Sequence, residues 1–227
     1  MGRWFALVAM AFLSACATSA PKTFSHFDPP PASARILVVT PDIQLSLLTA
    51  AGLQEPREDW SHSARDNIAA AVAAHIAAHG RPTATLDPNT AMEGHIGQII
   101  RLHDAVGSSI ISITYMGAPV LTRRNNFDWT LGPGVQELGQ TYNADYALFI
   151  GGGGSYASSG RVAAMIGMAV LGVGIPLGGQ ALYASLVDLH TGNIVWFNLA
   201  HAAPEQDMRQ APGASALTEV LMQGAPL

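Results

Sequence analysis

Cysteine and charge are both scarce in this chain of 227 residues. Cys16 is the single cysteine, so the chain forms no internal disulfide. Lysine and arginine number 11 against 16 acidic residues, which gives a net charge of −5, and the basic residues form no cluster. This distribution excludes nucleic-acid binding, because that function needs a basic patch. Since only 12% of residues are charged, much of the chain must be buried or must meet a partner.

The motifs of common enzyme classes are also missing. Glycines at 151–154 lack the Gly-Lys-Ser/Thr ending of a phosphate-binding loop. His75 and His79 have the spacing of two zinc ligands on one helix face, but no glutamate follows His75. No serine lies in a Gly-x-Ser-x-Gly elbow. We therefore expect no catalytic site, no cofactor and no metal site.

The first sixteen residues contain the parts of a secretory signal. Arg3 precedes an apolar run at 4–13, and small residues then lead to a cysteine. The pattern resembles a bacterial lipoprotein signal, with recognition residues Leu13, Ser14 and Ala15. This resemblance implies cleavage before Cys16, acyl chains such as palmitate on Cys16, and anchoring to a membrane. Ala17 stands where an aspartate would resemble an inner-membrane retention signal, so the outer membrane, on its periplasmic side, is favoured.

The chain divides into three parts. Residues 1–15 are the expected lipoprotein signal peptide. Residues 16–34 are rich in proline, serine and alanine. They are predicted to form an extended tether, because three consecutive prolines fit neither a helix nor an inner strand. Residues 35–227 are then expected to form a single α/β domain facing the periplasm.

Hydrophobic periodicity predicts strands and helices in turn along this domain. Residues 36–39 predict a buried strand that ends at Pro41. A helix follows, with Ser61 or Ser63 as its N-cap and Gly80 at its C-terminal end. Its apolar face consists of Ala64, Ile68, Val72 and Ile76. Further strands are expected at 81–86 and 144–150, helices at 92–106, 133–142 and 215–222, and a β-hairpin over 180–199. Residues 108–117 either extend the helix at 92–106 or form a strand.

Two segments of the domain resemble a known group of proteins. Ala144, Asp145 and Tyr146 open a strand, and the later hairpin carries Asp188, Thr191, Gly192, Ile194 and Trp196 around its turn. This strand and this hairpin together resemble the C-terminal half of the α/β module in envelope lipoproteins related to the curli-secretion lipoprotein and the N-terminal domain of TolB. The resemblance implies a mixed β-sheet with helices packed on it, and a role in assembly or transport without catalysis. Residues 92–129 have no counterpart in it.

Residues 151–179 combine four glycines with sixteen consecutive residues, 162–177, that lack polar side chains. A membrane span needs about twenty apolar residues, and glycines and Pro176 weaken the second half as a helix. A phosphate loop and a membrane span are therefore the less favoured alternatives. We expect a helix over 161–171 that is apolar all round, crosses over the sheet and is buried on more than one side. In the other version, its outer side faces a partner subunit or lipid.

The candidate interaction residues lie in this segment and in one loop. Trp129 belongs to a polar and aromatic loop at 123–130, where it either anchors a partner or covers the edge of the core. The other candidates are Tyr156, Arg161, Met165 and Met168. The expected partners are the membrane, through the N-terminal lipid, and an envelope protein or a second copy of the chain.

Two other functions stay open at this point. One is a periplasmic lipoprotein that binds a small molecule or a glycan in a cleft near 151–159. The other is a hydrolase. Asp145 and Asp188 would serve as acid and base only if the fold brought them together, and the same holds for His95 and His103 as metal ligands.

Overall fold

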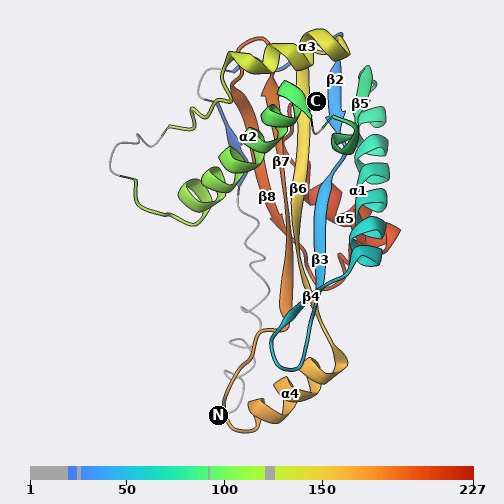
Figure 1. The fold of residues 1–227 in the computed structure, drawn as a ribbon, viewed down its shortest axis with the longest axis vertical. Coiled ribbons are helices and arrows are strands. Elements are labelled where there is room, and N and C mark those ends of the chain that lie inside the picture. Colours follow the sequence, from blue (N-terminus) through green and yellow to red (C-terminus); the bar gives the residue numbers. More distant parts are fainter. Residues whose placement is uncertain (1–19, 25–26, 92, 121–125) are drawn as a thin grey trace, which may run out of the picture.

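The structure is a computed structural model that describes residues 20–24, 27–91, 93–120 and 126–227. These residues form an α/β fold with one eight-stranded mixed sheet and helices packed on it (Figure 1), so the predicted fold class is confirmed. The predicted signal and lipidation residues Leu13, Ser14, Ala15 and Cys16 lie outside the described residues.

Strands and helices follow one another along the described residues. The strands are β1 (Lys22–Thr23), β2 (Ile36–Val39), β3 (Asp42–Leu48), β4 (Gln54–Pro56), β5 (Thr83–Leu86), β6 (Tyr146–Ala157), β7 (Gly178–Asp188) and β8 (Ile194–His201). The α-helices are α1 (Glu58–Ala78), α2 (Gly94–Ile110), α3 (Gln136–Tyr142), α4 (Ser159–Ala169) and α5 (Ala211–Leu221). Short 3₁₀ helices span Pro88–Thr90 and Pro133–Val135, and a π-helix spans Ile111–Tyr115.

Strand β6 is the centre of the sheet. The strand order is β1-β8-β7-β6-β2-β5. On one side β6 pairs antiparallel with β7 along its length. On its other side it pairs in parallel first with β2 and then, beyond Pro41, with β3. Strand β4 lies outside β3 as its antiparallel partner.

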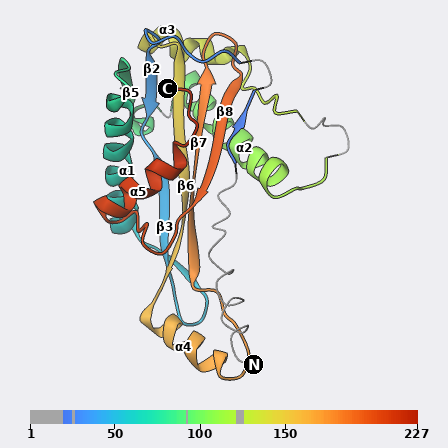
Figure 2. The same ribbon diagram turned by 180° about the vertical axis from the view of Figure 1, so that it is seen from behind.

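The helices cover both faces of the sheet and create two cores. Helix α2 lies in front of the sheet in Figure 1, whereas α5 lies in front of it in the reverse view of Figure 2. Trp196 is fully buried in the core that includes α1 and α5, and its neighbour Phe197 is fully buried in the core beneath α2. Successive residues of β8 therefore fill opposite cores, as the alternation of a strand requires.

The predicted apolar face of α1 is confirmed, but its start is not where it was expected. Ala64, Ile68, Val72 and Ile76 are all buried in one core. The helix begins at Glu58, with acidic side chains in its first turn that favour a helix N-terminus. The predicted N-caps Ser61 and Ser63 are therefore wrong. Ser61 instead accepts a hydrogen bond from the backbone N–H of Leu45 at 2.9 Å and so joins α1 to β3.

Residues 108–117 continue the second helix instead of forming a strand. Helix α2 runs to Ile110 and passes directly into the π-helix at Ile111–Tyr115. The Tyr115 hydroxyl donates a hydrogen bond to the carbonyl oxygen of Phe197 at 3.0 Å, which ties this extension to the sheet. Elsewhere the predicted strand before Asp87, the short helix before Asn143 and the C-terminal helix are all present.

Strand β3 was not predicted. Pro41 was expected to end the strand that begins at Ile36, but the chain resumes an extended path at Asp42 and stays beside β6 as far as Leu48. Ile43 and Leu45 are buried, whereas Asp42 and Gln44 are exposed. This short alternation is typical of a strand with one buried face, and it follows the proline without a turn.

The described part of the expected tether lies against the domain. Strand β1 pairs antiparallel with Trp196 and Phe197 of β8. Phe27 packs edge-to-face on Tyr146, with ring centroids 6.3 Å apart. Arg81 donates hydrogen bonds to the carbonyl oxygens of Pro30 and Pro31. Prolines lack an N–H but keep a carbonyl acceptor, so Pro30 and Pro31 contact the domain through their carbonyl groups.

The C-terminal hairpin is confirmed. Strands β7 and β8 pair antiparallel, and Gly192 in the turn has φ +81°. A Cβ atom on Gly192 would lie 2.2 Å from the carbonyl oxygen of Gly132. The turn therefore requires glycine both for its backbone angle and for its contact.

The four glycines at 151–154 form the middle of strand β6. They pair with β3 on one side and with β7 on the other, so their N–H and C=O groups serve the sheet and not a phosphate. Gly154 has φ +146°, and a Cβ atom there would lie 2.0 Å from the carbonyl oxygen of Gly179. This part of the strand therefore exists only because it has no side chains.

The expected buried crossover helix is wrong. Helix α4 begins at Ser159 and none of its residues is buried. It joins two antiparallel neighbours, β6 and β7, so the chain has no sheet to cross. Both views place α4 at the opposite end of the molecule from α3 (Figures 1 and 2). Within the described residues, no helix has the length and apolarity needed to span a membrane.

Replacing Gly154 with alanine is expected to destabilise the protein strongly. The new Cβ would overlap a backbone oxygen at a positive φ, and we expect a loss of about 2–4 kcal/mol in the free energy of unfolding. Gly167→Ala in α4 is the matched control, because nothing lies within 4 Å of its Cβ position. That control should gain up to about 1 kcal/mol from helix propensity. Urea titration of both variants measures the difference, and equal stability would contradict the assigned conformation.

Candidate interaction site

Strands β6 and β7 extend beyond the helix-covered part of the sheet and form an arm that carries α4 (Figure 1). We call residues 162–177, from the first turn of α4 through the loop after it, the apolar tip. Helix α4 starts where β6 ends, and the Ser158 hydroxyl oxygen caps it by accepting a hydrogen bond from the N–H of Arg161 at 3.1 Å. After the helix, Gly172 at φ +75° turns the chain back toward β7.

The apolar tip exposes its hydrophobic side chains to solvent. Val170 is 83% exposed, Leu171 is 74% exposed and Ile166 is 59% exposed. The other exposed large hydrophobic residues of the tip are Val162, Met168, Val173 and Leu177. Leu53, in the neighbouring loop between β3 and β4, is 67% exposed as well. Monomeric soluble proteins seldom expose such a continuous apolar surface without a partner for it.

Arg161 forms hydrogen bonds that hold the two ends of the apolar tip together and join it to the neighbouring loop. Its Nε donates a hydrogen bond to the carbonyl oxygen of Pro176 at 2.9 Å, and its Nη1 donates to the carbonyl oxygen of Ala50 at 3.5 Å. The first bond closes the loop after α4 onto the start of the helix, and the second joins it to the loop between β3 and β4. This candidate interaction residue therefore has a structural contact within the chain.

The two methionines predicted for interaction differ in position. Met168 is exposed and belongs to the outer surface of the apolar tip, whereas Met165 is half-buried. Both come from the same helix, so a partner that covers α4 would meet Met168 first. Methionine adapts its shape readily to irregular apolar surroundings.

Tyr156 lies in an aromatic and cationic cluster near the end of β6, two residues before the Ser158 cap. Its ring packs edge-to-face on Trp60, with centroids 5.8 Å apart, and the Arg209 guanidinium lies 3.6 Å from its centroid. Asp207 holds Arg209 through two charge-assisted hydrogen bonds. Burial raises the pKa of the Tyr156 phenol, and the Asp207 carboxylate adds to this effect. The cluster joins β6 to α1 and to the segment before α5.

Trp129 is half-buried at the edge of the core beneath α2. Its carbonyl oxygen accepts a hydrogen bond from the N–H of Ile194 at 2.9 Å, and the next residue, Thr130, forms an isolated bridge with Asn193. The described part of this loop is thus tied to the C-terminal hairpin. Of the two roles considered for Trp129, packing at the edge of the core is the one that its position supports.

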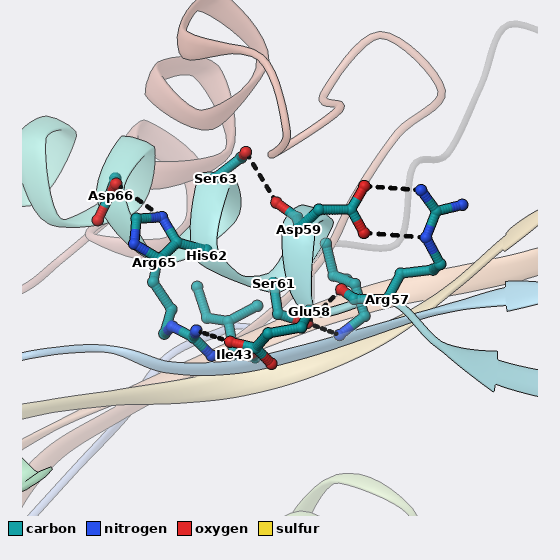
Figure 3. Close-up of polar contacts among 10 residues, drawn as sticks. Ile43, Arg57, Glu58, Asp59, Ser61, His62, Ser63, Arg65 and Asp66 are labelled. Carbon is teal, nitrogen blue, oxygen red and sulfur yellow. Dashed lines mark hydrogen bonds and ion pairs between the residues drawn. The ribbon is translucent and has the colours of Figure 1, made fainter.

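A charged cavity of about 580 Å³ opens at the carboxyl end of β2, between α1 and α2. Its walls include Asp42, Glu58, His62, Arg65, Asp66 and Asp104. Figure 3 shows how the first turns of α1 satisfy many of these groups: Arg65 pairs with Glu58, and His62 pairs with Asp66 at 3.1 Å. Arg65 also donates to the carbonyl oxygen of Ile43 at 3.3 Å. The Arg65–Glu58 pair therefore offsets part of this charge within the wall.

Serine, histidine and aspartate side chains do meet near this cavity. His103 Nε2 lies 2.7 Å from the Ser185 hydroxyl, and His103 Nδ1 lies 3.5 Å from Asp104. The order resembles a hydrolase triad, but Ser185 is fully buried in β7 and does not line the cavity. A nucleophile must reach its substrate, and Ser185 cannot do so from this position. Its hydroxyl instead provides a hydrogen-bond partner for the buried His103 ring. No local pattern in the sequence predicts this pairing.

The remaining candidates do not converge on a site. His95 pairs with Glu137, whereas His103 stacks on Phe149 with ring centroids 4.0 Å apart. His79 contacts the carbonyl oxygen of His75. In the residues described, no group of three or more histidine, cysteine, aspartate or glutamate side chains could hold a metal ion.

The two strand-end carboxylates stabilise the turn after β7. Asp188 accepts hydrogen bonds from the N–H of His190 and from the hydroxyl of Thr191, and Asp145 contacts the His190 ring at 3.2 Å. Asp145 also accepts a hydrogen bond from the backbone N–H of Arg35 at 2.8 Å. A second cavity, of about 710 Å³, lies beside Asp145 and His190. A cleft was expected near residues 151–159, but these residues line neither cavity. In β6 they pair with β3 on one side and with β7 on the other.

Acid is expected to destabilise the protein through His103. Burial lowers the pKa of His103, and the nearby Asp104 opposes this effect only in part. The unfolded chain then binds the proton more readily, so the free energy of unfolding falls as the pH drops below about 6.5. His103→Gln should remove this dependence, which amounts to at most about 1.4 kcal/mol per pH unit. Urea titrations of both proteins at pH 7.5 and 5.5 measure it. Parallel losses in the two proteins would contradict the neutral, buried histidine.

No family model matches the sequence, and no curated protein matches it. Among solved structures, the fold is similar to the PelC dodecamer from Paraburkholderia phytofirmans, with a TM-score of 0.37 and 13% identity over 92% of this chain and 96% of that chain. It is also similar to lipoprotein GNA1162 from Neisseria meningitidis (TM-score 0.34, 17% identity, 74% and 81% covered). A third is the LpoB C-terminal domain from Salmonella enterica (TM-score 0.29, 11% identity, 75% and 84% covered). At these scores the likenesses assign no family to the chain.

Proposed function

We propose that this protein is a lipid-anchored component of the bacterial cell envelope that acts by contact and not by catalysis. Its folded domain faces the periplasm from the outer membrane, and its role is structural or in assembly. The sequence pattern Leu13-Ser14-Ala15-Cys16 supports the proposed compartment, and the surface of the folded domain supports the proposed mode of action.

The observation that carries the proposal is the exposed apolar tip. Sixteen residues without a polar side chain are held away from both cores at the end of an arm. Exposing this much apolar surface to water is unfavourable, by roughly 25 cal/mol for each Å². A surface of this kind is stable only when a nonaqueous partner covers it. A protein that works through contact has a use for such a surface.

The cavities support the contact role less directly. At the charged cavity Arg65 pairs with Glu58 and His62 with Asp66, and Ser185 is fully buried in β7 against His103. Small-molecule sites normally combine an apolar lining with a few polar groups aimed into the space. Neither the charged cavity nor the cavity beside Asp145 has that character in its lining residues.

Replacing Cys16 tests the anchor. Cys16→Ala should abolish incorporation of labelled palmitate and release the protein from the outer-membrane fraction of a density gradient, because no other residue carries a thiol. Ala17→Ser is the matched control, since it changes the next residue and keeps the cysteine. The control should remain labelled and should sediment with the outer membrane. Unlabelled wild-type protein in the cytosol would end the proposal.

The contact role has its own test. Chemical crosslinking in intact cells, followed by purification of the tagged full chain, should yield specific higher-mass species that contain either an envelope protein or a second copy. The same treatment of the Cys16→Ala variant should yield fewer of them, because the unanchored chain leaves the membrane surface. Recovery of wild-type protein only as a monomer would contradict a role in assembly.

A further inference from the structure

From Val162 onward, helix α4 has only apolar side chains, and most of them are exposed. Successive residues of an α-helix point about 100° apart. Val162, Ala163 and Met168 therefore point in well-separated directions, and all three are exposed. A helix that docks on one protein surface normally has an apolar stripe and a polar opposite face. Since α4 has no polar face, a partner on one side would leave apolar side chains in water on the other.

The apolar tip also lacks the groups that make a protein interface specific. No charged side chain occurs between Arg161 and Asp188. Arg161 itself is held at the base of the tip by the carbonyl oxygens of Pro176 and Ala50. Protein interfaces combine apolar contact with hydrogen bonds that fix orientation. The hydrocarbon of a bilayer surrounds a helix on all sides and needs no such groups.

The size of α4 suits one leaflet. Its 11 residues extend for about 16 Å, which is about half the 30 Å hydrocarbon thickness of a bilayer. The exposed Leu53 of the β3–β4 loop lies on the same end of the arm, because the Ala50 carbonyl in that loop bonds Arg161. The helix, its following loop and Leu53 together make an apolar end with a single cation at its base.

The described chain before β1 leads toward the same end of the molecule. Lys22 pairs with Phe197, which in turn pairs with Ser185 of β7. Because β1 is antiparallel to β8, the chain before Lys22 leads in the direction that β8 takes, toward the arm. From Ser185 to Gly178, at the base of the apolar tip, β7 extends for about 23 Å. The six residue steps from Cys16 to Lys22 span at most about 20 Å, which would bring acyl chains on Cys16 within a few Å of the base of the tip.

We propose that the apolar tip, residues 162–177, is seated in one leaflet of the membrane that holds the acyl chains of Cys16. This inference rests on the proposed function, because the anchor brings the bilayer to the tip. The domain then has two attachments, one covalent lipid and one inserted helix. Two attachments fix the long axis of the arm relative to the membrane, which a single flexible anchor does not do.

A fluorophore on the tip tests the insertion in the full, acylated chain. Val170→Cys introduces a reactive thiol at a side chain that is 83% exposed and outside both cores. Acylated Cys16 does not react, so an environment-sensitive dye labels position 170 alone. Ala70→Cys, on the exposed face of α1, is the matched control. Both proteins are reconstituted into phosphatidylethanolamine–phosphatidylglycerol vesicles with spin-labelled acyl chains. The dye at 170 should be quenched, and the dye at 70 should keep its emission.

The outcomes separate this inference from the proposed function. Water-like, unquenched emission at both positions would overturn the insertion. Shielding of the dye at 170 without quenching by the spin-labelled lipid would also overturn it, because a protein partner or a second copy then covers the tip. Reaction of the dye with wild-type protein would show a free Cys16 thiol and would overturn the anchor instead. Circular dichroism of the Val170→Cys and Ala70→Cys variants confirms that both are folded.

Discussion

The fold depends on the glycine stretch of strand β6, where neighbouring strands approach so closely that side chains would not fit. At Gly151–Gly154, β6 receives β3 on one edge and β7 on the other, and a Cβ atom on Gly153 would lie 2.1 Å from the carbonyl oxygen of Gln44. Neighbouring backbones thus occupy the space that side chains would need. Backbone hydrogen bonds do not require a hydrophobic core beside them, so they continue the sheet through this stretch and into the arm. The helix-covered domain and the apolar tip are connected by this continuity.

Two kinds of contact follow one another where β6 ends. At Tyr156, packing with Trp60 and Arg209 joins β6 to α1, so the strand is stabilised by contacts within the chain. Just beyond it, the Ser158 cap and the Arg161 hydrogen bonds define the shape of the tip without burying it. The hydrophobic side chains of the tip therefore contribute nothing to either core. Their composition reflects what surrounds the tip and not how the domain folds.

Local patterns in the sequence predicted most of the fold. The four-residue spacing of Ala64, Ile68, Val72 and Ile76 identified the buried face of α1, and Gly192 marked the hairpin turn correctly. Strand β3 was missed, because a proline conceals the short alternation that follows it. The His103–Ser185 pair was missed for a different reason. It joins residues 82 positions apart, and neither residue belongs to a local motif. Single-sequence patterns report local periodicity and not which distant elements meet.

The error over α4 shows what an apolar pattern establishes. A helix without a polar face indicates nonaqueous surroundings, and protein interior and lipid satisfy that condition equally. Topology decides between them. Parallel neighbours in a sheet need a crossover that packs on the sheet, and residues 158–177 are long enough for one. Antiparallel neighbours need only a turn, so any helix inserted between them lies at the edge of the fold. Because β6 and β7 are antiparallel along their whole pairing, the sheet cannot cover α4. Its apolar surroundings must therefore come from outside the chain's own cores, and the arm places it where a membrane can supply them.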